Sequence, residues 1–394
     1  MASLNLTKDS FLARLITFLA LLLLLPIGSQ KVYSQISIKT WAKSLSKSAQ
    51  VRYNRVEGMF LGYKLNVPLK SVEHVSMFAG GGFGANNRSL KWEGGIGYQS
   101  SILNVRFSVF DRTETNDREI VQVGENSIYT LMLKWDYMDY FRAKNGFEVK
   151  GRYRFRRHLN LLGRLTAFTY ESMPMTFTTG WSVFHRGRPF RVNPAIQPGD
   201  AGLIQLGAVF DNRIRSPLFR NAWYLNALYE RGFREFEYNG FLLAAKRHQK
   251  LIFGDQAVIL QARMGTRQST AEQVLFDLGG FSTLRGYEIK EFTGNRMILL
   301  SADYMFRGDA LSRIPLPGFH LLNLLLFYDT GWVASVPRTA SLLEGFGDLK
   351  LNEFKSNYGI AVALPRQLLR INLAKRTDRS SDAWVLTARL KREF

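Results

Sequence analysis

The sequence Leu-Gly-Gly-Phe-Ser-Thr-Leu-Arg-Gly-Tyr occupies residues 278–287 and guides the interpretation of the whole chain. It contains Gly279, Gly280 and Gly286, and its one charged residue is Arg285. Glycine adopts backbone conformations that other residues avoid, so three glycines around one arginine favour a tight loop over a helix or a strand interior. If such a loop folds inward, it carries the guanidinium of Arg285 into the protein.

A second short motif, Phe-Tyr-Asp-Thr-Gly at residues 327–331, follows a strand-like apolar run and contains a single carboxylate, that of Asp329. A buried charge without a partner is costly. We therefore expect Arg285 to form an ion pair with Asp329.

In this order, and in a chain that ends in Phe394, the two motifs resemble the BamA/TamA superfamily of outer-membrane assembly barrels, also called bacterial surface antigens. In that family a long extracellular loop folds back into the barrel, and its Arg-Gly-Phe/Tyr tip bonds an aspartate of a Phe-x-Asp-x-Gly strand. The matching residues are Arg285, Gly286 and Tyr287 in the loop motif, and Phe327, Asp329 and Gly331 in the strand motif.

Two further segments are similar to the family. Residues 53–58 look like the barrel start of Bacteroidetes-type members, and residues 210–213 resemble an Asp-x-Arg strand end. The chain departs from the family pattern at Leu284, where valine is usual, and at Asp303, where glutamate is common. Only residues 35–50 separate the N-terminal leader from the first expected strand, so the resemblance covers the barrel and implies a member without periplasmic POTRA domains.

Many segments alternate apolar and polar residues, which is the pattern of a strand with two different faces. Residues 146–157 show it most clearly. A membrane barrel would turn the apolar face to lipid and the charged face to a wet lumen, whereas a soluble sandwich would bury the apolar face, and this segment alone fits both. Expected strands are 52–65, 72–79, 90–98, 103–111, 146–157, 159–169, 202–211, 223–231, 240–247, 255–263, 297–306, 319–329, 357–364, 368–376 and 383–394.

Segments 128–141 and 176–185 are ambiguous and could add two strands. With the resemblance, the prediction is an all-β fold: a transmembrane antiparallel β-barrel of sixteen strands with a long loop folded into the lumen, in the even-numbered range of bacterial barrels. The alternating aromatic and apolar residues of the last strand, which would end at Phe394, also resemble the recognition signal of outer-membrane barrels.

The N-terminus predicts a secretory signal peptide over residues 1–34. Lys8 and Arg14 precede a short apolar core that is too short to span a bilayer as a helix. Cleavage is expected after Ser34, with Ser29 as the alternative. Residues 35–50 would form a short periplasmic lead-in, and residues 51–394 the barrel in the bacterial outer membrane.

The chain is strongly basic, with a net charge of +21, a pI near 10.1 and a mean hydropathy of −0.12. Its basic residues are spread over alternating strand positions and form no basic helix, so we expect no nucleic-acid partner. Lumen charges and basic loops that face outer-membrane lipids and lipopolysaccharide explain the charge better. Periplasmic or outer-membrane proteins are possible further partners.

Sequence motifs for catalysis, cofactors and metals are incomplete. The glycine-rich residues 80–84 lack the Lys-Ser/Thr of a phosphate-binding loop, and Gly180-Trp-Ser and Gly280-Phe-Ser lack the final glycine of a nucleophile elbow. The five histidines are scattered, and the chain has no cysteine. We therefore expect no catalytic residue, no cofactor, no metal site and no enzyme activity.

Three functions remain open: insertion or translocation of proteins at the outer membrane, a passive pore or lipid-handling channel, and a barrel subunit docked in a larger envelope complex. The resemblance favours the first. That function would need the first and last strands to part at a weak seam, to which the sequence assigns Gly58 and Gly62 in the first strand and Leu390 and Phe394 in the last.

Overall fold

The protein is described here by a computed structural model. The described residues are 48–390, without 70, 178–179, 185–186, 188, 214–220, 253–255, 307–321, 365–368, 380 and 382. The chain divides into two compact units, Met1–Ala49 and Gln50–Phe394. The expected signal peptide, most of the lead-in and Phe394 lie outside the described residues.

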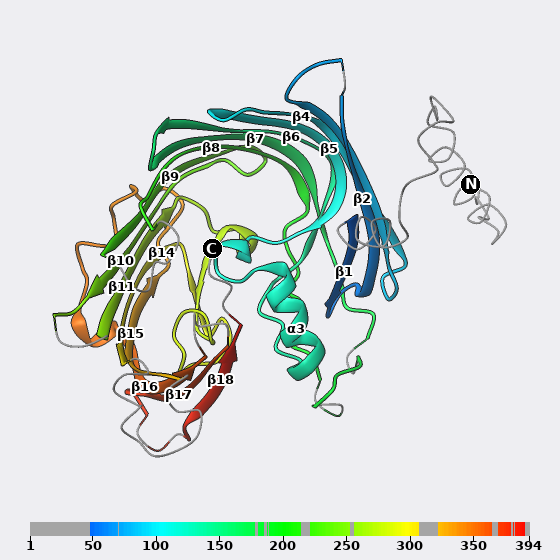
Figure 1. Cartoon of the computed structure of the whole chain (residues 1–394). Helices are drawn as coiled ribbons and strands as arrows, with labels where there is room; N and C mark the ends of the chain where they lie inside the picture. The colour runs from blue at the N-terminus through cyan, green and yellow to red at the C-terminus, as the bar shows by residue number, and fades with distance from the viewer. Residues whose placement is uncertain are drawn as a thin grey trace. The chain divides into compact units, whose positions relative to one another are not determined.

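In the described part of the second unit, sixteen strands form one sheet in which each strand pairs with the next strand of the sheet along the chain (Figure 1). Every ladder from β2 to β18 is antiparallel. The strands are β1 (Ala49–Asn54), β2 (Gly58–Pro68), β3 (Val75–Gly84), β4 (Ser89–Gln99), β5 (Leu103–Glu114), β6 (Phe141–Arg156), β7 (Leu159–Ser172), β8 (Gly199–Asp211), β9 (Ala222–Arg234), β10 (Tyr238–Lys250), β11 (Gln256–Arg267), β14 (Arg296–Phe306), β15 (Asn323–Ala334), β16 (Lys355–Ala363), β17 (Arg370–Arg376) and β18 (Val385–Arg389).

The connections carry the remaining elements. β12 (Phe276–Leu278) and β13 (Phe292–Gly294) form a small antiparallel hairpin inside the β11–β14 connection. The β5–β6 connection holds η1 (Asp117–Glu119) and the helix α3 (Val123–Leu133), and two further short helices are η3 (Glu272–Val274) and η5 (Leu351–Glu353). Among the described residues, no helix has the length and apolar character needed to cross a membrane.

The two faces of the sheet differ as the alternating pattern predicts. On β6, Val149, Tyr153 and Phe155 are 38%, 46% and 54% exposed on one face, whereas Glu148 on the other face is 3% exposed. The sheet curves so that this second face surrounds α3 and the β12–β13 loop (Figure 1). The expected all-β fold with a sixteen-stranded antiparallel sheet is therefore confirmed, and every expected strand outside the two ambiguous segments overlaps a strand of the sheet.

The longest described connections, residues 115–140, 173–198, 268–295 and 335–354, all leave the same end of the sheet, named here the long-loop end. The opposite end, the short-turn end, includes the tight connections 100–102 and 157–158. Outer-membrane barrels have short periplasmic turns and longer extracellular loops, so this polarity matches their orientation.

The expected first strand, 52–65, is wrong: it is two strands, β1 and β2, joined by a turn at residues 55–57. The Asn54 side chain makes this turn, because its Oδ1 accepts hydrogen bonds from the backbone N–H groups of Val56 (3.0 Å) and Glu57 (2.7 Å). Gly58 follows with φ +64°, a conformation that favours glycine. Gly58 and Gly62 therefore belong to β2 and not to the first strand, which corrects their assignment to the seam.

Apart from Phe141, which begins β6, the described residues of the two ambiguous segments are not strands of the sheet. Residues 128–133 are the second half of α3, whose C-cap Lys134 has a left-handed conformation (φ 56°), and residues 135–140 lead from there to β6 without regular secondary structure. The described residues of 176–185 form an irregular loop. β18 begins at Val385, two residues later than the start of the expected strand at 383.

Candidate functional site

The β11–β14 connection, called the inner loop here (residues 268–295), folds tightly around its glycines. Gly279 and Gly280 have φ values of +121° and +88°, which other residues rarely adopt. The Thr283 Oγ1 accepts a hydrogen bond from the Gly279 N–H (2.8 Å) and donates one to the Gly279 carbonyl (3.0 Å). The loop thus returns on itself, and its tip presents Arg285.

The structure brings Arg285 and Asp329 together. The Arg285 Nε donates to Asp329 Oδ2 at 2.7 Å and its Nη2 to Asp329 Oδ1 at 2.5 Å, a bidentate pair. The same Nη2 reaches Asp303 Oδ1 at 3.0 Å, and the guanidinium lies 3.8 Å from the centre of the Phe327 ring. All of these side chains are buried, so we call Arg285, Asp303 and Asp329 the loop lock.

A second arginine balances the charge of the loop lock. Arg370 on β17 donates to both oxygens of Asp303, at 2.7 and 3.0 Å, and Asn357 on β16 donates to Asp329 Oδ2 at 2.9 Å. Two guanidinium groups therefore face two carboxylates, which limits the penalty for burying all four. Burial alone would lower the pKa of Arg285, but Asp303 and Asp329 outweigh it and raise that pKa, so the guanidinium stays charged.

Close packing surrounds the loop tip. A Cβ at Gly286 would lie 2.9 Å from the Asn357 Cβ, and one at Gly331 would lie 2.7 Å from the Leu278 Cδ1. Tyr287 donates its hydroxyl to the Ser356 carbonyl (3.0 Å). Both glycines are thus sites where the loop and the wall approach too closely for a side chain.

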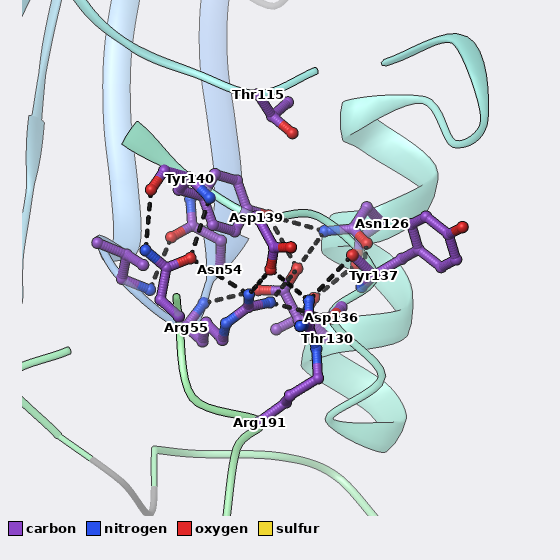
Figure 2. Close-up of polar contacts among 12 residues, drawn as sticks. Asn54, Arg55, Thr115, Asn126, Thr130, Asp136, Tyr137, Asp139, Tyr140 and Arg191 are labelled. Carbon is purple, nitrogen blue, oxygen red and sulfur yellow. Dashed lines mark hydrogen bonds and ion pairs between the residues drawn. The ribbon is translucent and has the colours of Figure 1, made fainter. Parts of the chain in front are cut away.

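A second polar cluster, the turn cluster, ties the β1–β2 turn to the β5–β6 connection (Figure 2). The fully buried Arg55 donates from Nη2 to Asp139 Oδ1 (2.6 Å) and from Nη1 to the Asp136 carbonyl (3.0 Å). Its backbone N–H bonds Asp136 Oδ2 (2.9 Å). Arg191 also binds Asp139 Oδ1, at 2.5 Å.

Lys290 joins the inner loop to the turn cluster. Its Nζ lies 2.7 Å from Asp139 Oδ2, 2.9 Å from Asp117 Oδ2 and 3.0 Å from Asp277 Oδ2. Burial alone would lower the pKa of Lys290, but these three carboxylates outweigh it and raise the pKa. Burial alone would raise the pKa of Asp139, but Lys290, Arg191 and Arg55 lower it to about 2. The Asp139 carboxylate is therefore ionised at neutral pH, whereas burial raises the pKa of its neighbour Asp117.

Helix α3 lies between the first and last strands of the sheet (Figure 1). The backbone N–H of Tyr53 on β1 donates to Ser127 Oγ (3.2 Å), and the backbone N–H of Leu390, just after β18, donates to the Tyr129 hydroxyl. Arg389 donates to the Ile120 carbonyl (3.1 Å). Among the described residues no ladder pairs β1 with β18. The edges of both strands are bonded instead by one helical segment, and we call these contacts the seam.

Phe281 connects the inner loop to the seam. Its buried ring packs against Tyr129, Trp135 and Tyr137, with ring centroids 4.9, 6.4 and 5.6 Å apart. Such aromatic contacts contribute beyond the area that they bury. The inner loop therefore contacts the sheet wall through Arg285, the turn cluster through Lys290 and α3 through Phe281.

Comparison with solved structures places this geometry in a known fold. The structure is similar to that of BamA from Haemophilus ducreyi lacking POTRA domains 1–3, with a TM-score of 0.54 and 12% sequence identity over 86% of this chain and 69% of that chain. The chain has the BamA barrel fold. The fold-level resemblance inferred from the two sequence motifs is thereby confirmed.

Two CdiB structures are also similar to this BamA-type barrel, each with 12% identity and a TM-score of 0.44. CdiB from Acinetobacter baumannii matches 86% of this chain and CdiB from Escherichia coli 87%, and the chain spans 58% and 61% of their lengths, less than two thirds. No protein-family profile and no curated protein sequence matches the chain.

In this BamA-type barrel the motif residues Arg285, Gly286, Tyr287 and Asp329 gather at the loop lock, and Leu390 lies at the seam. Gly58 and Gly62 lie on β2, away from the loop lock and the seam. Phe394 lies outside the described residues. Sequence reasoning missed Arg55, Arg370, Lys290 and α3. The sequence did indicate a turn at Arg55, because the preceding residue, Asn54, is of a type that favours turns.

Proposed function

We propose that this chain is an outer-membrane barrel of the BamA/TamA superfamily that helps to insert or translocate other proteins, and that its terminal strands part at the seam. The observation that carries the proposal is the position of α3. Side chains of the helix bond the backbone of Tyr53 and Leu390, and among the described residues no ladder pairs β1 with β18.

Contacts of this kind are easier to exchange than a strand ladder. Each side-chain hydrogen bond contributes only about 0.5–1.5 kcal/mol net. A sheet edge exposed to lipid has no water to satisfy its N–H and C=O groups, so an edge released by α3 would need another strand as partner. An incoming strand of a client protein would supply it by pairing along β1 or β18.

The experiment cross-links each side of the seam separately. Cysteine pairs replace Tyr53 and Ser127 on the β1 side, and Glu125 and Arg389 on the β18 side, whose charged atoms are 3.5 Å apart. A reducible bifunctional thiol reagent joins each pair, and the native chain contributes no cysteine of its own. The purified protein is placed in liposomes, and a urea-unfolded test barrel is added.

The readout is the fraction of test barrel that acquires heat-sensitive gel mobility with time. We expect the reduced protein to speed this folding, cross-linking of both sides to abolish the effect, and reductant to restore it. Single-cysteine variants treated with the same reagent are the controls. Equal folding rates with the seam open and cross-linked would contradict the proposal and favour a passive pore.

A further inference from the structure

The inner face of β6 carries three basic side chains in succession: Lys150, Arg152 and Arg154. They alternate with Val149, Tyr153 and other residues of the outer face, and they lead toward the short-turn end. All three are exposed. We call them the β6 basic row.

The neighbouring strands add charge of the same sign. Arg106 on β5 and Arg164 on β7 lie directly opposite Lys150 in the two ladders. Like charges in opposite positions destabilise a sheet. The arrangement therefore has a cost in folding free energy that something else must offset.

Too few carboxylates are available nearby. Glu148 contacts Arg112 (3.6 Å), Arg164 (2.7 Å) and Lys150 (3.5 Å) at once. Within the described part of the chain, no acidic side chain comes within ion-pair distance of Arg152 or Arg154. Lys150 shares Glu148 with other cations, and the opposing Arg106 reaches Glu93 (3.6 Å). The charges of Arg152 and Arg154 are therefore the ones that stay uncompensated.

The other end of the same strand shows that this is a local property. There Arg142 makes a bidentate pair with Asp111 (2.7 Å for both bonds) and reaches Glu171 at 3.2 Å. Arg142 shares the strand with the β6 basic row but lies on its other face, because the ladders of β6 shift register between Lys144 and Phe147. Toward the short-turn end of β6, Arg152 and Arg154 have no ion pair of this kind with any described residue.

We propose that the β6 basic row binds an extended, acidic segment of a second polypeptide that enters the barrel from the short-turn end. Alternate side chains on a strand are separated by about 6.6–6.8 Å. An extended peptide with an acidic residue at every second position has the same spacing, so successive carboxylates match Lys150, Arg152 and Arg154. The charged wall of a water-filled lumen also concentrates ions of the opposite sign.

The location favours a polypeptide over a membrane surface. The apolar outer face of β6 is the face that would meet lipid, so the row is turned away from any bilayer. An occupant must be narrow enough to lie along one strand inside the wall. This inference does not require the terminal strands to part, so it is independent of the proposed insertion role.

The test measures peptide binding to the full chain in uncharged detergent by fluorescence anisotropy. The probes are three labelled decapeptides of equal length: alternating Glu-Ser, five Glu followed by five Ser, and alternating Lys-Ser. We expect the alternating acidic peptide to bind most tightly and the lysine peptide not to bind. Arg152→Gln with Arg154→Gln should weaken binding roughly tenfold, and added salt should reduce the difference.

The matched control removes two exposed charges elsewhere, with Arg338→Gln and Lys350→Gln in the long connection 335–354. It should bind like the native chain. The reversal Arg152→Glu with Arg154→Glu should transfer the preference to the lysine peptide. Equal binding of both acidic peptides, equal loss in the control, or displacement of the peptide by inorganic phosphate or anionic lipid vesicles at low concentration would each overturn the proposal. The insertion assay is unaffected by these outcomes.

Discussion

The loop lock and the seam both join segments that are distant in the sequence, but they use different chemistry. The loop lock buries two arginines and two aspartates in bidentate contact. The seam relies on backbone N–H groups that donate to Ser127 and Tyr129, on a half-buried contact of Arg389 with Glu125, and on aromatic packing. Breaking a buried ion pair strands a charge, whereas breaking a neutral hydrogen bond does not. The comparison indicates a fixed inner loop beside a releasable strand junction.

The strongest test of this contrast is Arg285→Ala. It leaves the buried carboxylate of Asp329 with Asn357 as its remaining side-chain partner, so we expect a loss of about 3–5 kcal/mol in stability of the folded loop. Trypsin should then cut after Lys290, which is buried in the native chain. The barrel should stay in the membrane, and Arg338→Ala is the control. Unchanged trypsin resistance would show that the ion pair does not fix the loop.

Acid should loosen the turn cluster. The folded pKa of Asp139, about 2, lies below the ordinary value near 3.9, so the ionised carboxylate stabilises the fold above about pH 4. This contribution, roughly 2–3 kcal/mol, is lost as the pH falls through about 2. Amide exchange in residues 134–140, corrected for intrinsic rates, should increase over that range. The exchange rates of Asp139→Asn should depend less on pH. Exchange rates of the native chain that do not change with pH would contradict the mechanism.

Gly286→Ala tests the close approach of the inner loop to the wall. Its new methyl group would lie 2.9 Å from the Asn357 Cβ, and overpacking of this kind costs about 1–3 kcal/mol. A Cβ at Gly347 meets no atom within 4 Å, so Gly347→Ala is the matched control. The temperature at which gel mobility shifts should fall for the first variant only. An equal fall in both would mean that the tip tolerates the methyl group.

The smallest effect is expected at the seam. Tyr129→Phe removes the hydroxyl that accepts the Leu390 N–H, at a cost of about 1 kcal/mol. Exchange of the Leu390 and Tyr53 amides should speed up several-fold, while the amides of residues 278–287 keep their protection. If the loop amides respond as strongly as the seam amides, the two regions do not differ as proposed.

Sequence reasoning found the loop lock but not the seam, for physical reasons. Arg285 and Asp329 stood out because glycine spacing marks a loop and a buried arginine demands an acid. Arg370 did not stand out, because alternating basic residues occur on many strands of this chain. Residues 53–58 alternate like a strand, although Asn54 makes them a turn. α3 has no side-chain cap at its start, so its stability comes from packing that a sequence pattern does not display.

Phe281 makes the two regions thermodynamically dependent on each other. Its ring belongs to the inner loop but packs on Tyr129, whose hydroxyl bonds the end of β18. Withdrawal of α3 would remove Tyr129 from the Phe281 ring, and release of the loop would remove a neighbour of α3. Because a coupling free energy is reciprocal, opening of the loop favours opening of the seam by the same factor by which opening of the seam favours opening of the loop. A ligand that binds only the open seam would therefore weaken the contacts of Arg285 without contacting Arg285 itself.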